Sequence, residues 1–138
     1  MALELIPLCT LTLTLGDYQR VGVTPSGNLV VIPVVDGALE GERVHGRLKP
    51  PAAADWFTIG PEGTATLDVR FTFETPDGAL VFVAYTGRRD AADRDAPTYA
   101  YVRFETGDDR YVWLNRLLAV AKGRLDGQVA TYEVYEVR

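Results

Sequence analysis

The chain is poor in the residues that hold metals and disulfides. Among its 138 residues there are one cysteine, one histidine and one methionine. With Cys9 as the only thiol, an internal disulfide is excluded, and nothing in the sequence is typical of an oxidising compartment. A transition-metal site would have to rely on carboxylates, so we expect neither a metal nor any other cofactor.

Long apolar segments are also missing. The longest one, Leu29 to Val35, is far shorter than the ~18 residues that a membrane span requires. Glu4 stands where a signal peptide would be apolar, and no basic residue precedes it. We therefore expect a cytoplasmic protein that has no membrane partner.

Positive charge is scarce as well. The chain has 14 Lys and Arg against 19 Asp and Glu, a formal net charge of −5. Binding to nucleic acid needs a concentrated basic surface, so we expect no nucleic-acid partner. Gly-rich phosphate loops, a Gly-x-Ser-x-Gly elbow and paired-cysteine metal motifs are absent too, so no common catalytic motif identifies a reaction.

What the sequence does contain is a period-two alternation of apolar and polar residues along almost its whole length. Hydrophobic residues make up 47% of the chain and aromatic residues 10%, which is enough for a core. Roughly eight to ten short strands separated by turns predict an all-β protein, a barrel or a sandwich. We predict a single domain, residues 1–138, that forms a closed or half-closed antiparallel β-barrel (calycin-like) with at most short helical turns.

The clearest local prediction is a hairpin between Thr66 and Thr86. The Thr-Pro-Asp-Gly segment from Thr75 to Gly78 suits a type I turn closed by a glycine bulge. A three-residue loop there pairs Phe73 with Val81, Phe71 with Val83 and Val69 with Tyr85. All six side chains then share an apolar face, while Asp68, Arg70, Thr72 and Glu74 share the other, so register and hydrophobic pattern agree.

A second hairpin is predicted between Tyr99 and Val120, with its turn at Gly107 to Asp109. In this register Arg103 faces Trp113, Glu105 faces Tyr111 and Tyr101 faces Asn115. The opposite face carries Ala100, Val102, Phe104, Val112 and Leu114. Both faces have side chains to bury, as expected for strands between a core and a pocket or partner.

Several stretches, taken in order, resemble one known family. They are Thr24 to Gly27, Glu40 to Arg47, Ala54 to Trp56, Leu67 to Val83, Phe104 to Gly107 and Tyr111 to Asn115. In their order and spacing they are similar to the small β-barrel family catalogued as a domain of unknown function, DUF3237. The resemblance implies an antiparallel barrel with an internal cavity and no established family-wide reaction. Members usually carry a longer insertion between the strands that here end at Arg88 and begin near Tyr99, so this barrel's mouth is expected to be more open.

Asp68 and Arg70 are the candidate catalytic residues, because they lie two apart on one strand face. On a solvent face the pair would stabilise the fold by only about 0–1 kcal/mol. In a cavity, Arg70 would hold a substrate carboxylate or enolate while Asp68 moves a proton.

The candidate ligand-binding residues combine aromatic rings with a few polar groups, as small-molecule sites do. They are Trp56, Arg103, Glu105, Tyr111, Trp113 and Asn115. Two alternatives stay open for this face: an amphipathic outer surface, or the contact of a homodimer. For Trp56, packing in the core is a further alternative.

These residues predict three functions. The first is a cofactor-independent enzyme, an isomerase, lyase or cyclase, that acts by proton transfer on a small aromatic or polyketide-like acid. The second is a non-catalytic barrel that carries a small hydrophobic molecule. The third is a purely oligomeric structural module. Burial of Asp68 or Glu105 inside the barrel would distinguish the first two, because a carrier has little use for a carboxylate in an apolar interior.

Overall fold

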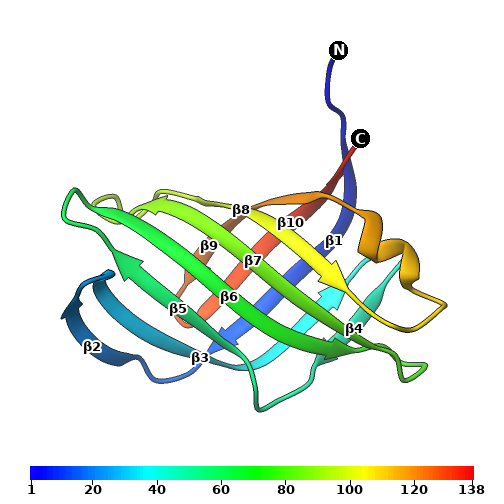
Figure 1. Cartoon of the computed structure of the whole chain (residues 1–138), viewed down its shortest axis with the longest axis horizontal. Coiled ribbons are helices and arrows are strands. Elements are labelled where there is room, and N and C mark those ends of the chain that lie inside the picture. The colour runs from blue at the N-terminus through cyan, green and yellow to red at the C-terminus, as the bar shows by residue number, and fades with distance from the viewer.

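The alternating segments form ten antiparallel strands in the computed structural model, which describes residues 1–138 (Figure 1). In chain order they are β1 (Leu5–Leu15), β2 (Gln19–Thr24), β3 (Gly27–Glu40), β4 (His45–Leu48), β5 (Ala54–Ile59), β6 (Thr64–Glu74), β7 (Leu80–Asp90), β8 (Thr98–Glu105), β9 (Ala119–Asp126) and β10 (Val129–Val137). One five-residue 3-10 helix, η1 (Val112–Arg116), lies between β8 and β9. The predicted all-β fold with at most short helical turns is confirmed, and no helix is long and apolar enough to cross a membrane.

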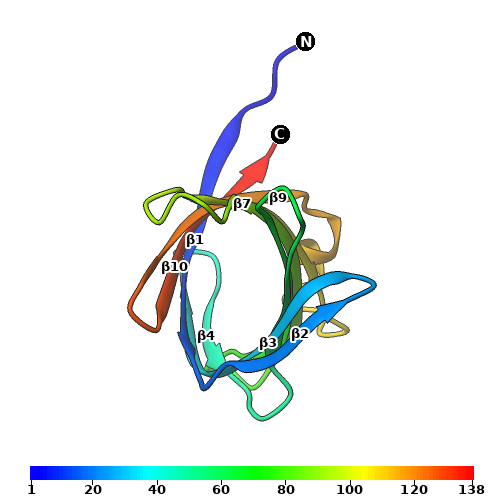
Figure 2. The same ribbon diagram turned by 90° about the vertical axis from the view of Figure 1, so that its left-hand side faces the viewer.

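Closure of the sheet depends on the 14-residue strand β3. The strand order is β1-β10-β9-β8-β7-β6-β4-β3-β2, and the C-terminal half of β3 pairs back onto β1. Its N-terminal half pairs with β5, which also pairs with β6, and with the hairpin partner β2. The result is a closed antiparallel barrel, seen end-on in Figure 2, with β2 as an additional edge strand.

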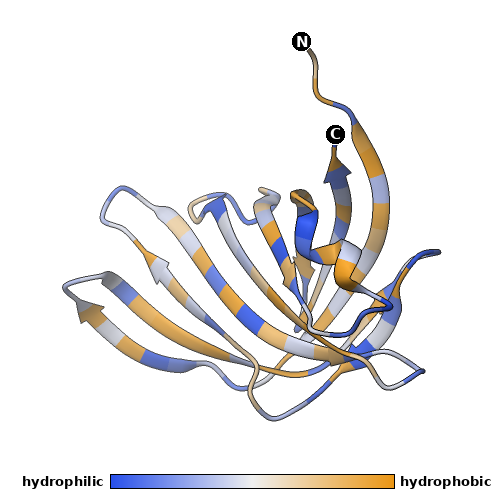
Figure 3. Cartoon of the chain, turned by 45° about the vertical axis from the view of Figure 1, so that its right-hand side comes forward, coloured by the Kyte–Doolittle hydropathy of each residue, from blue (hydrophilic) through white to orange (hydrophobic).

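Period-two alternation places one face of each strand inside the barrel (Figure 3). Strand β8 shows the pattern throughout, with Thr98, Ala100, Val102 and Phe104 buried and the residues between them exposed. Large apolar side chains fill one half of the barrel. They include Leu13, Leu39, Phe71, Phe73, Val81, Val83, Phe104 and Leu114, each at most 3% exposed.

The predicted β6–β7 hairpin is confirmed in every pair. Phe73 lies opposite Val81, Phe71 opposite Val83 and Val69 opposite Tyr85. The Thr75 N–H donates to the Ala79 carbonyl at 2.9 Å, which leaves a three-residue loop. Gly78 closes it with φ +86°, a conformation that glycine adopts without steric cost.

The register predicted for the second hairpin is wrong. Strand β8 pairs with β7 on one side and with β9 on the other, where Tyr101 lies opposite Val120 and Val102 opposite Ala119. The intervening residues form a loop, which two hydrogen bonds between the Asn115 side chain and the Thr106 backbone close. The Thr106 N–H donates to Asn115 Oδ1 at 2.8 Å, and Asn115 Nδ2 donates to the Thr106 carbonyl at 2.9 Å. Within the loop, η1 turns the fully buried side chain of Leu114 into the filled half of the barrel.

Candidate active site in the open half of the barrel

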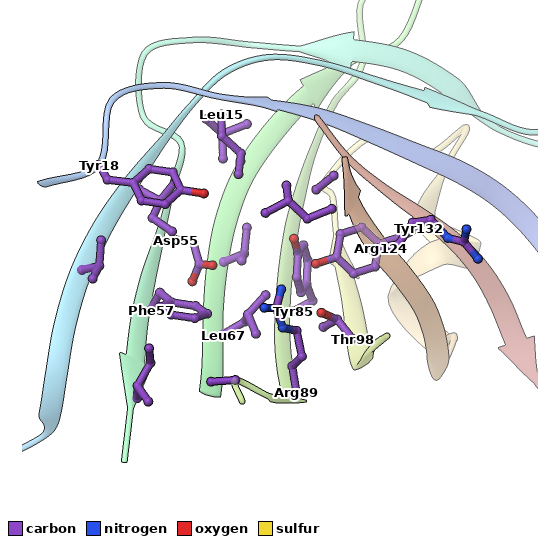
Figure 4. Close-up of a pocket in the computed structure, with 18 of the residues that line it drawn as sticks. Leu15, Tyr18, Asp55, Phe57, Leu67, Tyr85, Arg89, Thr98, Arg124 and Tyr132 are labelled. Atoms are coloured by element: carbon purple, nitrogen blue, oxygen red, sulfur yellow. The ribbon is translucent and has the colours of Figure 1, made fainter. Parts of the chain in front are cut away.

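The half of the barrel that faces away from η1 encloses a cavity of about 320 Å³. Its wall is mostly apolar, with Ile32, Phe57, Ile59, Leu67 and Val69 among the lining residues. Its polar side chains come from several strands, and those from β5, β7, β8 and β10 point into the same space (Figure 4). An apolar cavity with a few convergent polar groups is the usual form of a small-molecule site.

Asp55 is the one acidic residue of the cavity wall. It alternates with the exposed Trp56 on β5, so its side chain turns inward, and it is only 6% exposed. The backbone N–H of Asp68 donates to its Oδ1 at 3.0 Å. Burial raises the pKa of Asp55 from its ordinary 3.8 to about 7; this hydrogen bond lowers it and the Asp68 charge raises it further. At neutral pH the carboxyl group is therefore present in both its protonated and its ionised form.

Tyr85 and Tyr132 face each other from β7 and β10. Their ring centroids are 5.1 Å apart, with the planes inclined at 57°. Both side chains are buried, and burial raises both phenol pKa values above their ordinary value of 10.0. Their hydroxyls point toward one another in the cavity (Figure 4). At neutral pH both groups are thus neutral O–H donors in an apolar surrounding.

Arg89 enters the cavity from β7, four residues beyond Tyr85 on the same strand face. Its guanidinium lies close to Tyr85 and Thr98 (Figure 4), and its charge acts on Tyr132, whose pKa it lowers. Two further arginines on the wall, Arg20 and Arg124, are exposed at the rim. The site thus carries three cationic side chains and a single carboxyl group.

Together these groups suit acid–base chemistry on an organic molecule. Asp55 exchanges a proton near neutral pH, the two phenols donate hydrogen bonds, and arginine stabilises negative charge. No group of three or more His, Cys, Asp or Glu side chains is arranged to hold a metal ion.

The predicted catalytic pair lies outside the barrel. The side chains of Asp68 and Arg70 are each about half exposed on β6, with Arg70 Nη2 3.5 Å from Asp68 Oδ2. The Arg70 guanidinium also stacks over Trp56, 4.5 Å from the ring centroid. Arg103 of β8 joins Asp68 and Arg70 along an outer groove of about 190 Å³.

The other predicted ligand-binding residues lie near the filled end. Glu105 and Asn115 line a surface depression beside Thr106 and Gly107. The Tyr111 hydroxyl donates to the Asp77 carboxylate at 3.0 Å, and Trp113 lies under Arg43, 4.9 Å from its ring centroid. The eight predicted residues therefore occupy two surface regions, and none lines the barrel cavity. Their catalytic and ligand-binding roles, and the homodimer contact, stay predictions.

Sequence reasoning missed the polar residues of the cavity, although their strand positions were visible. Tyr85 belongs to the face predicted to be apolar, and Arg89 follows on that face with the period of two. Asp55 lies on the same face of its strand as Phe57, and Trp56 lies on the opposite face. A charged residue in phase with the apolar face of a strand was the available signal.

The profile of one protein family, described as "Protein of unknown function (DUF3237)", matches residues 3–137 of the chain. UPF0311 protein RPA1785 of Rhodopseudomonas palustris is 30% identical, over 93% of this chain and 92% of its own length. The crystal structure of a beta-barrel like protein from Acinetobacter baumannii AYE, 27% identical, has a TM-score of 0.91 and covers 100% of this chain and 98% of the other. An enzyme from Penicillium herquei shares the fold, with a TM-score of 0.76 and 22% identity over 99% of this chain and 94% of its own. The match along nearly the whole length shows that the chain belongs to the DUF3237 family.

Proposed function

We propose that this protein is a cofactor-independent enzyme that transfers a proton within a small aromatic or polyketide-like acid bound in the barrel cavity. The observation that carries the proposal is the position of one buried carboxyl group, Asp55, in an apolar cavity that also holds Tyr85, Tyr132 and Arg89. The reaction class is isomerisation, with lyase or cyclase chemistry as variants that begin with the same step.

In that step the Asp55 carboxylate removes a proton from a carbon next to a substrate carbonyl group. The C–H bond breaks and its electron pair forms a C=C bond, the π electron pair of the carbonyl group moves to the oxygen, and the proton stays on Asp55. The resulting enolate oxygen accepts hydrogen bonds from Tyr85 and Tyr132, which stabilise charge best where water is excluded. Return of the proton to a different carbon regenerates the carboxylate and completes an isomerisation without any co-reactant.

Two observations favour catalysis over the carrier function. Burying an ionisable carboxyl group costs free energy, and a carrier of neutral apolar molecules would gain nothing from it. A pKa of about 7 also suits a general base that works near neutral pH, because both protonation states are accessible. The enzyme from Penicillium herquei is a case in which the same barrel fold belongs to a catalyst.

The test is hydrogen–deuterium exchange of the methylene protons of phenylpyruvate, an aromatic 2-oxo acid, followed by NMR in D2O. We expect the wild-type protein to accelerate exchange and Asp55→Asn to lose roughly 100-fold or more of the rate, in the range found for general bases. The rate should rise with pH up to about 7 and then level off, because the ionised carboxyl group is the base.

Asp36→Asn is the matched control. Asp36 also accepts a backbone N–H, from Gly37 at 2.8 Å, but it lies on the outer surface. Asp36→Asn should exchange phenylpyruvate as the wild type does. Equal rates in wild type and Asp55→Asn would overturn the proposal, and a selective loss in Asp68→Asn would instead support Asp68 as the base.

A further inference from the structure

Arg89 is the feature of the cavity that the proton transfer leaves unexplained. Its Nε is the one buried side-chain nitrogen or oxygen without a hydrogen-bond partner in the chain. None of the ion pairs of the chain includes it. A buried N–H group costs free energy unless a hydrogen-bond partner replaces the water that it has lost.

The cavity gives this guanidinium no adequate counter-ion of its own. Asp55 is the only acid on the wall, and its Oδ1 already accepts the Asp68 N–H. Arg20 and Arg124 add positive charge at the rim. In a chain with a net charge of −5, this local excess of cations favours entry of an anion into the cavity.

We propose, as a deepening of the proposed function, that Arg89 anchors the carboxylate of the ligand through its Nε edge and so restricts ligands to organic monoanions. A carboxylate matches the parallel N–H groups of a guanidinium and forms two charge-assisted hydrogen bonds with it. The apolar body of the ligand then lies against Phe57, Ile59 and Leu67 of the cavity wall.

The size of the cavity limits the apolar body. Its volume of about 320 Å³ is about twice that of the engineered ~150 Å³ cavity that binds benzene. A ligand of two fused rings with one carboxylate therefore fits. 2-Naphthoate is a probe of this size, and 2-naphthamide is its neutral counterpart with nearly the same shape.

Isothermal titration calorimetry with these two probes tests the anchor. We expect the wild-type protein to bind 2-naphthoate at least tenfold more tightly than 2-naphthamide, as one charge-assisted contact in a buried site provides. Arg89→Met keeps the length of the side chain and should abolish this preference. Arg47→Met, which removes an exposed arginine from the outer surface, should retain it. Near-UV circular dichroism verifies that each variant keeps the wild-type packing.

The outcomes separate this inference from the proposed function. Selective binding of 2-naphthoate that depends on Arg89, without exchange of phenylpyruvate, leaves the anchor in place and removes the catalytic role. Exchange that depends on Asp55, together with equal binding of 2-naphthoate and 2-naphthamide, supports the catalytic role and overturns the anchor. Absence of 2-naphthoate binding, or an unchanged preference in Arg89→Met, overturns the anchor.

Discussion

At the scale of the residue, Asp55 links the chemistry of the site to the stability of the fold. Its carboxyl group has a pKa of about 7 in the folded chain against an ordinary value of 3.8. Between these two pH values the folded state binds more protons than the unfolded state. The free energy of unfolding is therefore highest below pH 4, where the contribution of Asp55 is full, and this contribution is lost as pH rises through 7. The free energies of unfolding at these two extremes differ by roughly 4 kcal/mol as an upper limit.

Asp55→Asn should therefore stabilise the protein at pH 8 and bring little gain at pH 4. The amide oxygen still accepts the Asp68 N–H, so the substitution removes the charge and keeps the hydrogen bond. Urea unfolding of both proteins from pH 4 to pH 8 measures the effect. The carboxyl group is not titrating as described if the difference between the two free energies of unfolding stays constant over this range.

At the scale of the element, a glycine in β9 leaves the space that the Tyr132 ring of the neighbouring strand β10 occupies. Gly123 lies opposite Tyr132, and a Cβ at Gly123 would meet Cε1 of the ring at 2.5 Å. Gly123→Ala therefore has to displace the ring, and overpacking of this kind costs about 1–3 kcal/mol. We expect a lower Tm and slower phenylpyruvate exchange. Gly107→Ala is the control, because a Cβ there meets nothing within 4 Å; a Tm loss as large as that of Gly123→Ala would refute the steric explanation.

Elements also mark the limit of what the sequence predicts. The β6–β7 hairpin was predictable because its turn chemistry and its alternation select the same register, which local sequence contains. The segment from Gly107 to Leu118 was not, because side-chain contacts with residues far away in the chain decide its path, such as the contact of Tyr111 with Asp77 in the β6–β7 loop. The cavity was missed for a related reason. Period two shows which residues share a face, but the strand order that brings Asp55 of β5 and Tyr132 of β10 into one space is a property of the closed barrel.

At the scale of the whole molecule, closure of the barrel makes Cys9 a reporter of global opening. Cys9 lies in β1, which joins β10 on one side and β3 on the other, and it is 7% exposed. Burial, and to a smaller extent the charge of Glu133, raises the pKa of its thiol to about 12, so the reactive thiolate is scarce at pH 8.

We expect a thiol reagent such as 5,5′-dithiobis(2-nitrobenzoate) to label Cys9 of the folded protein only as fast as the barrel opens. Labelling should accelerate with urea along the unfolding transition, and at pH 8 it should be slower in the more stable Asp55→Asn variant. Rapid labelling without denaturant, with the β-sheet circular dichroism unchanged, would mean that β1 separates from its neighbours while the rest of the barrel stays folded.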